Sequence, residues 1–290
     1  MRVGRNKGIA ALFKSMGIFP QKRLGQHFLK DTLVSQAIVA ACELENDDVV
    51  IEIGAGLGVL TLPLCGKARK VFAIELDEGI AQILRERILP KDAKNVEVIR
   101  EDALDFDFHD THRRYGKKLK AVGNLPYSIS TPILFKLIES RDALSLAVLM
   151  FQKEVSDRIV AKPGNKSYGI LSVISQYFAK AESIMVVGPG AFYPQPEVNS
   201  AVVRLRFGIS RTVVAEDETL FTAVVKAAFG KRRKILRNAL TYGLHLSLKE
   251  VNNVLNVSGI DGKRRAETLS VEEFVRLSNI LKEIGLPIQR

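Results

Sequence analysis

One tetrapeptide, Asn124-Leu-Pro-Tyr127, carries residue types that could hold an aromatic amine in position for methylation. The Asn124 side-chain carbonyl and the backbone carbonyl of Leu125 or Pro126 could accept both hydrogens of an adenine amino group, which would aim its lone pair at an electrophilic methyl group. Pro126 would fix the turn, and Tyr127 offers a flat face on which an extruded base can stack. Alternatively the turn is structural: Asn124 would cap a helix expected from Ser130, and Tyr127 would belong to the core.

A glycine-rich loop, Gly54-Ala-Gly-Leu-Gly58, directly follows the β-branched run Val49-Val-Ile-Glu-Ile53. A buried strand that enters such a loop lets the backbone approach a nucleotide, because Gly54 and Gly56 carry no side chain that would block it. The G-x-G-x-G spacing differs from the G-x-G-x-x-G spacing of dinucleotide-binding loops, and the loop has no Walker lysine. This loop therefore favours a nucleoside cofactor without phosphate groups, such as S-adenosylmethionine, over a nicotinamide dinucleotide.

Two acidic residues follow the next two expected strands. Glu75 lies 21 residues after Gly54, where its carboxylate could accept hydrogen bonds from both ribose hydroxyls of a nucleoside. Asp102, just beyond the third strand, could accept a hydrogen bond from the adenine amino group. Both acids could instead be solvated strand ends. Because they follow successive strands in a chain that also carries the glycine loop, we expect them to bind the cofactor.

The elements that must position these residues follow a regular order along the chain. From Val49 onward, short β-branched runs alternate with longer helical patterns, which is typical of βα units on a parallel sheet. Two later β-like runs, 183–187 and 198–207, would close the sheet antiparallel, and after Gly208 only helical spacing appears. We expect an α/β fold with three parts: a basic N-terminal arm (1–30), a catalytic domain (31–207) and a small all-α domain (208–290).

Composition narrows the class of protein. The chain has 290 residues, 47% of them hydrophobic and 26% charged, which suits a sizeable core and is far from the composition of disordered chains. No run approaches the ~18 uncharged apolar residues that span a bilayer, so no membrane anchoring is expected. Cys42 and Cys65 are too few for a disulfide framework and fit a reducing compartment. His109, Asp110 and His112 have no further ligand at useful spacing, so no metal site is expected.

The charge is strongly positive, since 43 Lys and Arg against 32 Asp and Glu give a net charge of +11, which favours an anionic partner such as nucleic acid. Several cations are expected on one face of a helix over 231–240. They are Lys231, Arg232, Arg233, Lys234 and Arg237. The basic arm includes Lys22 and Arg23. We predict that the arm and this helix contact RNA phosphates; the alternatives are a solvated helix face and, for the arm, an organelle transit peptide.

At this point the sequence resembles the KsgA-type ribosomal RNA adenine dimethyltransferases, which are class I methyltransferases related to the Erm resistance enzymes. The resemblance covers nearly the whole chain. It rests on Leu24-Gly-Gln-His-Phe-Leu29, Glu52-Ile-Gly-Ala-Gly-Leu-Gly58, Asn124-Leu-Pro-Tyr127, Gln152-Lys-Glu-Val155, Ser167-Tyr-Gly-Ile-Leu-Ser172, Phe192-Tyr-Pro-Gln-Pro-Glu-Val-Asn-Ser200, Arg232-Arg-Lys-Ile-Leu-Arg-Asn238 and Arg265-Ala-Glu-Thr-Leu269.

The resemblance implies a Rossmann-like, seven-stranded, mostly parallel sheet that binds S-adenosylmethionine. It implies that His27 and Leu29 join Gly54, Gly56, Glu75, Asp102 and Asn124 around that cofactor. It also implies that Phe192 faces Tyr127 across the target adenine. The implied reaction adds two methyl groups to each of two adjacent adenines in the 3′-terminal hairpin loop of small-subunit rRNA, within immature subunits in the cytoplasm, by a monomer. His27 and Ala55 depart from the Asn and Pro that many members have, which leaves the contact of His27 open.

Three other functions make different demands on the sequence. An Erm-like methyltransferase would act on large-subunit rRNA, and the segments 192–200 and 265–269 argue against it. A non-catalytic RNA-binding assembly factor could keep the fold, but the intact Asn124 and Tyr127 favour catalysis; a second role in subunit maturation is compatible with either. A nicotinamide oxidoreductase disagrees with the spacing of the glycine loop.

Overall fold

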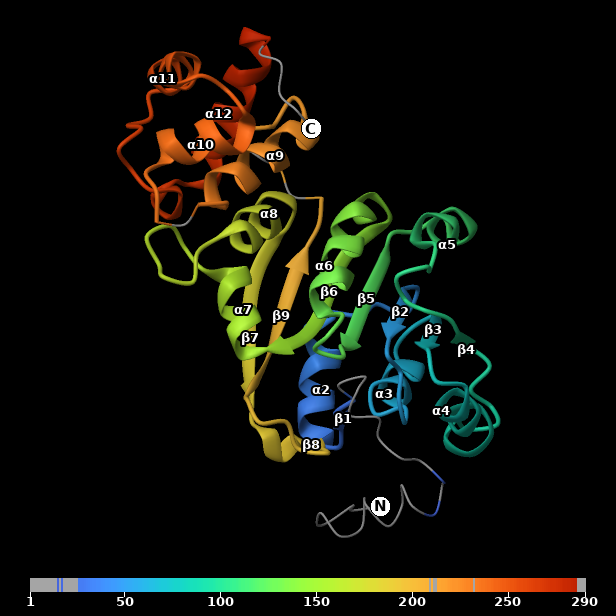
Figure 1. The fold of residues 1–290 in the computed structure, drawn as a ribbon. Helices are drawn as coiled ribbons and strands as arrows, with labels where there is room; N and C mark the ends of the chain where they lie inside the picture. The colour runs from blue at the N-terminus through green and yellow to red at the C-terminus, as the bar shows by residue number, and fades with distance from the viewer. Residues whose placement is uncertain are drawn as a thin grey trace. The chain divides into compact units, whose positions relative to one another are not determined.

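The computed structural model describes residues 15, 17, 26–208, 210, 213–231 and 233–285. A seven-stranded sheet forms the centre of the N-terminal part, in the order β4-β3-β2-β5-β6-β9-β7 (Figure 1). Its strands are β2 (Val49–Ile53), β3 (Lys70–Glu75), β4 (Val96–Arg100), β5 (Leu119–Asn124), β6 (Leu144–Gln152), β7 (Lys180–Val187) and β9 (Ser200–Arg206). The pairs from β4 to β6 are parallel and β9 is antiparallel to β6. This arrangement confirms the expected Rossmann-like, mostly parallel sheet.

The strand order places a topological switch point between β2 and β5. From β2 the chain adds β3 and β4 on one side, and then returns to add β5 and β6 on the other side. The connections after β2 and β5 therefore diverge and leave a crevice at the carboxyl ends of these two strands, where open α/β sheets bind ligands. Both the glycine loop after β2 and Asn124 at the end of β5 lie at this crevice.

Helices cover the sheet on both faces, as alternating βα units require. They are α2 (Thr32–Ala41), α3 (Thr61–Cys65), α4 (Glu78–Ile83), α5 (Phe108–Tyr115) and α6 (Ser130–Glu139), with short helical turns at Leu84–Ile88, Arg141–Ala143 and Pro189–Ala191. Helix α7 (Lys153–Val160) follows β6 directly. One buried cluster joins Ile38 and Val39 of α2 and Leu64 of α3 to Val50 of β2 and Val122 of β5. This packing anchors the strands whose ends carry the predicted site.

A second, two-stranded sheet joins segments that are far apart in the sequence. Strand β1 (Phe28–Leu29) pairs antiparallel with β8 (Phe192–Tyr193), so Leu29 lies opposite Phe192 and Phe28 opposite Tyr193. The Lys30 N–H also donates to the Ala191 carbonyl. The N-terminal segment is thereby held against the loop that precedes β9.

The remaining helices pack around an aromatic core. They are α8 (Ile170–Phe178), α9 (Glu218–Phe229), α10 (Leu236–Leu244), α11 (Leu248–Val257) and α12 (Val271–Ile284). The ring centroids of Tyr177 and Phe221 are 4.3 Å apart, and those of Phe229 and Phe274 are 5.8 Å apart. A Cβ atom on Gly243 would lie 2.6 Å from the Cβ of Ala227, so α9 and α10 can only pack this closely because residue 243 is glycine.

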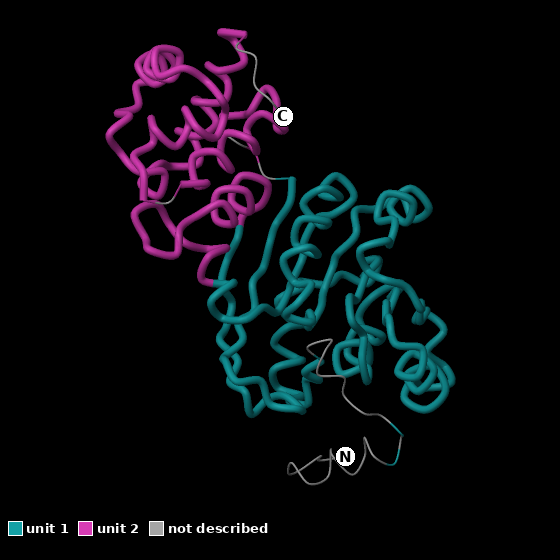
Figure 2. Tube along the Cα trace, in the orientation of Figure 1, with its two compact units in different colours: residues 1–156, 181–208 teal, residues 157–180, 209–290 magenta. Residues whose placement is uncertain are grey.

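Packing divides the chain into two compact units, residues 1–156 with 181–208 and residues 157–180 with 209–290 (Figure 2). The second unit includes residues 157–180, which the sequence pattern places in the catalytic domain (31–207). Aromatic contacts of α8 with α9 account for this grouping. The functional division into arm, catalytic domain and helical domain stays a prediction. No helix of the described residues is long and apolar enough to span a membrane.

Candidate active site

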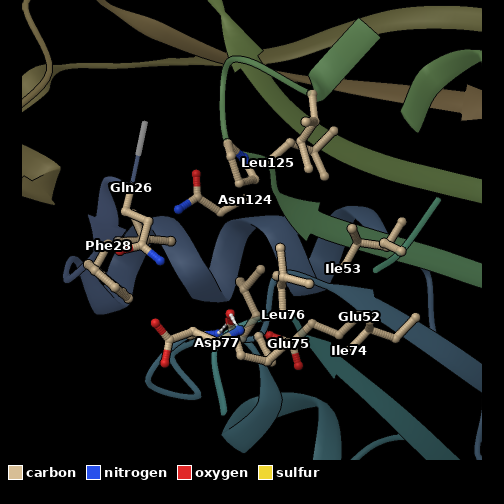
Figure 3. Close-up of a pocket in the computed structure, with 18 of the residues that line it drawn as sticks. Gln26, Phe28, Glu52, Ile53, Ile74, Glu75, Leu76, Asp77, Asn124 and Leu125 are labelled. Atoms are coloured by element: carbon tan, nitrogen blue, oxygen red, sulfur yellow. Dashed lines mark hydrogen bonds between the residues drawn. The ribbon is translucent and has the colours of Figure 1, made fainter. Parts of the chain in front are cut away.

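A cavity of about 400 Å³ opens at the carboxyl ends of β2, β3 and β5. In Figure 3, Asn124 and Leu125 lie on one side of it, Glu75, Leu76 and Asp77 on the opposite side, and Gln26 with Phe28 at one end. The structure thus brings together nine residues that the sequence assigned to cofactor or amine. They are His27, Leu29, Gly54, Gly56, Glu75, Asp102, Asn124, Leu125 and Pro126.

The glycine loop forms the floor of the cavity through a backbone that favours glycine. Gly54 has a φ of +73° and Gly56 a φ of +53°, in the left-handed region that side chains disfavour. A Cβ atom on Gly56 would lie 3.3 Å from the Phe28 ring. The N–H groups of Gly54 and Ala55 both donate to the Ile74 carbonyl, which ties the loop to the end of β3.

Glu75 is a buried carboxylate held by backbone N–H groups. Its Oε2 accepts from the Gly56 N–H at 2.9 Å and its Oε1 from the Asp77 N–H at 3.0 Å. Burial raises the pKa of Glu75, although the hydrogen bonds from Asp77 and Gly56 counteract the shift. Since each carboxylate oxygen has two acceptor sites, both oxygens can still accept from a diol. The geometry suits the predicted ribose contact, whose role stays a prediction.

Asp102 lies farther along the same edge, directly after β4. Its Oδ1 accepts from the Leu104 N–H at 2.9 Å, which fixes the carboxylate at the cavity wall. Its predicted contact with the adenine amino group is compatible with this placement and stays a prediction.

Asn124 has a defined amide orientation. Its Nδ2 donates to the His27 backbone carbonyl at 2.8 Å, so its Oδ1, the acceptor, is directed elsewhere. The capping alternative for this residue is wrong: α6 has Ile129 at its N-cap position and no side-chain cap. The Pro126 carbonyl accepts from the Ile129 N–H at 3.1 Å. That bond favours the Leu125 carbonyl over the Pro126 carbonyl as the second acceptor for an amine.

The two predicted aromatic residues have different surroundings. Tyr127 is half-buried, its hydroxyl is 2.6 Å from the Ser200 Oγ, and its ring centroid lies 5.4 Å from that of His27. Phe192 is 1% exposed and belongs to the buried cluster that includes Leu29. Neither Tyr127 nor Phe192 is among the described residues that line the cavity. Their pairing across a base stays a prediction.

Sequence reasoning assigned no role to several cavity residues. Gln26 and Phe28 reach the cavity through the β1–β8 pairing, a non-local contact that no local pattern indicates. Leu76 and Asp77 follow Glu75 directly, so their position after a strand end was an available signal.

Glu52 is the fully buried acid of the cavity. It is 1% exposed, and its Oε2 has no hydrogen-bond partner. Burial raises the pKa of Glu52 to about 8; Thr61 beside it lowers the value and the Glu75 carboxylate raises it. Burial therefore favours the protonated form of this carboxyl group, unlike that of an exposed glutamate.

The predicted RNA-binding cations do not share one helix, and that part of the prediction is wrong. Lys231, Arg233 and Lys234 are exposed residues of the turn before α10, which begins at Leu236. The N–H of Leu236 donates to the Arg264 carbonyl and that of Arg237 to the Gly262 carbonyl. These two residues therefore do not bond back to residues before α10, and the helix does not extend in that direction. Closely spaced like charges also disfavour a helix here.

Arg237 is the one predicted RNA-binding residue that lies in α10, where it is only half-buried. Its Nε is buried without a hydrogen-bond partner. Lys22, Arg23 and Arg232 lie outside the described residues.

Comparison with known proteins gives consistent matches over most of the chain. The family model described as ribosomal RNA adenine dimethylase matches residues 20–283. A relative named "Ribosomal RNA small subunit methyltransferase A" from Desulforapulum autotrophicum is 43% identical over 271 residues, 93% of this chain and 95% of the relative. A protein of the same name from Bacillus mycoides is 44% identical over 276 residues, 93% of this chain and 94% of that protein.

Two solved structures resemble the fold over almost their full length. A dimethyladenosine transferase from Plasmodium falciparum has a TM-score of 0.78 at 28% identity, covering 90% of this chain and 99% of that chain. The 23S rRNA methyltransferase ErmE has a TM-score of 0.70 at 25% identity, covering 88% of this chain and 99% of that chain.

Proposed function

The chain belongs to the ribosomal RNA adenine dimethylase family, and we propose that it dimethylates N6 of two adjacent adenines in the 3′-terminal hairpin loop of small-subunit rRNA. It is a methyltransferase that uses S-adenosylmethionine, as the family does. The observation that carries the proposal is the amide orientation of Asn124, whose Nδ2 is held by His27 so that Oδ1 is an acceptor at the cavity.

The cavity suits the cofactor on chemical grounds. The described residues that line it include no Lys or Arg, so it offers no cationic side chain for a pyrophosphate. It does offer the carboxylates of Glu75 and Asp102, which accept hydrogen bonds from ribose and adenine. These groups fit a nucleoside with a positively charged sulfonium and disagree with a nicotinamide dinucleotide. When bound, the cofactor supplies an electrophilic methyl group.

The chain's own residues orient the amine. We propose that the Asn124 Oδ1 and the Leu125 carbonyl accept the two N6 hydrogens, which localises the nitrogen lone pair and points it toward the methyl group. No strong base is needed, because the methylated nitrogen carries a positive charge and is acidic enough to lose its proton. Tyr127 would stack on the extruded base. The proposed role of Phe192 opposite Tyr127 requires RNA binding to uncover a ring that is 1% exposed here.

RNA docking is proposed for the basic arm (1–30) and the helical domain (208–290). The exposed turn residues Lys231, Arg233 and Lys234 support this proposal. Replacing Arg232, Arg233 and Lys234 by Ala should flatten the log-log salt dependence of RNA binding by roughly 0.7 per lost phosphate contact. Replacing three cations of α5 and the connector after it, Arg113, Arg114 and Lys118, is the control. A slope that changes equally in both triple variants would mean that only net charge matters.

The substrate is tested by methyl transfer. Labelled S-adenosylmethionine should label unmethylated small-subunit particles, and nucleoside mass spectrometry should find dimethyladenosine confined to the 3′ hairpin. Naked large-subunit rRNA should stay unlabelled. Label in the large subunit would favour the alternative suggested by the structural similarity to ErmE. Absence of label in both, with cofactor bound, would favour a non-catalytic assembly factor.

The oligomeric state of the enzyme, its compartment and the ribosomal particle on which it acts are proposed as well. The names of the relatives support an rRNA substrate of the small subunit. We propose that the enzyme acts as a monomer in the cytoplasm on immature small subunits. Sedimentation of the protein with subunits from successive assembly stages would test the preferred particle.

A further inference from the structure

His27 touches three parts of the proposed site. Its imidazole Nδ1 lies 2.8 Å from the Pro194 carbonyl, next to β8. Its backbone carbonyl accepts from the Asn124 Nδ2 at 2.8 Å. Its ring centroid is 5.4 Å from that of Tyr127, with an angle of 35° between the ring planes. The family resemblance implies that His27 binds the cofactor, and His27 does line the cavity. These three contacts add links from His27 to Pro194, Asn124 and Tyr127.

The contact with Pro194 defines which nitrogen carries the hydrogen. A backbone carbonyl only accepts, so the Nδ1 of His27 must be the donor of this hydrogen bond. That bond extends the short ladder between β1 and β8, which consists of two residue pairs and the Lys30–Ala191 bond beyond them. The His27 side chain thus closes the ladder at the end that faces the cavity.

We propose that His27 is a positioning residue for methyl transfer: it links β8 to Tyr127 and Asn124, and so holds the amine acceptor and the stacking ring in one arrangement. This inference rests on the proposed function. Its consequence is that the imidazole acts mainly on turnover, because orientation of reacting groups within about 1 Å strongly affects rate. A cofactor contact would act mainly on cofactor affinity.

The role requires a hydrogen-bond donor close to the Nδ1 position. An asparagine at residue 27 has its Nδ2 at a comparable distance from the backbone, so it can donate to the Pro194 carbonyl. An aspartate has the same shape, but its ionised carboxylate only accepts and would face a carbonyl oxygen. The variants His27→Asn and His27→Asp therefore differ in donor ability at nearly constant volume.

The experiment compares wild type, His27→Asn, His27→Asp and His27→Ala. A matched control is His112→Ala, since the His112 Nδ1 contacts the Lys117 carbonyl at 2.9 Å, remote from the cavity. For each protein we would measure the Kd of S-adenosylmethionine by calorimetry, kcat and KM on small-subunit particles, and amide hydrogen exchange of residues 191–193. Thermal unfolding checks that each variant is folded.

We expect His27→Asp and His27→Ala to lower kcat by about 10-fold to 100-fold, to keep cofactor Kd near the wild-type value, and to accelerate amide exchange of residues 191–193. His27→Asn should restore kcat and slow exchange, and His112→Ala should change neither. A weaker cofactor Kd with unchanged kcat would overturn the proposal, as would equal behaviour of the Asn and Asp variants. If wild type labels no particle, the proposed substrate fails, while exchange still reports on the His27 bond.

Discussion

Acidic side chains near the amino edge of the central sheet, where its parallel strands begin, have other partners than the acids of the cavity at the carboxyl edge, where these strands end. At the amino edge the acids are paired with cations: Lys117 Nζ lies 2.5 Å from Asp47 Oδ1 and 3.1 Å from Asp48 Oδ1, and Lys120 Nζ lies 2.8 Å from Asp48 Oδ2. Arg204 and Arg206 pair with Glu43 and Glu182 near the same edge. At the carboxyl edge, Glu75 and Asp102 accept only from backbone N–H groups among the bonds of the described residues, and the Glu52 Oε2 has no partner.

The pKa values of these acids shift in opposite directions at the two edges of the sheet. Burial would raise the pKa of Asp48, but hydrogen bonds from the Glu45 backbone and from Lys120 and Lys117 lower it. The hydrogen bond from Arg206 lowers the pKa of Glu43. Burial raises the pKa of Glu75 and Glu52 at the other edge. The acids at the amino edge have cationic partners inside the chain, whereas Glu75 and Glu52 leave acceptor capacity open, which costs stability.

The largest expected effect is on the pH dependence of stability, through Glu52. Its carboxyl has a pKa of about 8 when folded and an ordinary value of 4.5. A raised acid pKa means that the unfolded chain ionises first, so wild type loses stability as pH rises from about 4.5 to about 8, by on the order of 5 kcal/mol. Glu52→Gln should remove this loss. The measurement is the free energy of unfolding by denaturant between pH 5 and 9.

A variant at the other edge should behave with the opposite sign. The pKa of Glu43 is lowered, so its contribution is present above the unfolded pKa and disappears as pH falls through the folded pKa. Glu43→Gln should therefore destabilise at neutral pH and have little effect in acid. If Glu52→Gln and Glu43→Gln changed the free energy of unfolding with the same pH profile, the contrast between the two edges would be contradicted.

Next in size is the loss of the half-buried cation Lys120, which pairs with a buried acid at the amino edge. Lys120→Met keeps the apolar stem but leaves the carboxylate of Asp48, 2% exposed, with one ammonium partner fewer. We expect a loss of about 3 kcal/mol in unfolding free energy, with no change in the Kd of S-adenosylmethionine. Calorimetry and chemical denaturation measure the two quantities. A weakened cofactor Kd would mean that the two edges are coupled.

At the carboxyl edge, Asn124→Ala should lower kcat by about 100-fold or more, which corresponds to about 2.7 kcal/mol. The reason is the loss of one preorganised acceptor for the amine, so cofactor binding should persist. Asn95→Ala is the matched control: Asn95 donates to the Cys65 and Ala68 carbonyls, and its loss should reduce stability but not kcat. Turnover near the wild-type value in Asn124→Ala would contradict the proposed orientation of the amine.

The smallest effect concerns cofactor affinity. Glu75→Ala should weaken binding of S-adenosylmethionine by about 1.5 to 3 kcal/mol, the value of hydrogen bonds to a charged acceptor. Glu75→Gln keeps one oxygen acceptor and should lie between wild type and Glu75→Ala. Glu182→Ala, which removes an acid near the amino edge, should leave the Kd unchanged. An unchanged Kd in Glu75→Ala would mean that the ribose binds elsewhere.

Local patterns predicted much of the first unit. The expected strand end at Glu75, the helix expected from Ser130 and the glycine loop after Ile53 all occur as predicted, because apolar periodicity and glycine spacing are local properties. The helix expected over 231–240 starts only at Leu236. The N–H groups of its first two residues donate to the carbonyls of Arg264 and Gly262 and not to a preceding helical turn. No stretch of sequence around residue 231 contains that information.

The sequence by itself determined the residue types of the site, the succession of its strands along the chain and the family. Only the tertiary structure decided which polar atoms meet: that Asn124 donates to the His27 carbonyl, that Glu75 accepts from Gly56, that Phe192 is buried against Leu29, and that Glu52 has an oxygen without a partner. The physical reason is distance along the chain. Hydrophobic periodicity is set by neighbours within a few residues, whereas a hydrogen bond between residues 27 and 124 exists only after the sheet has brought them together.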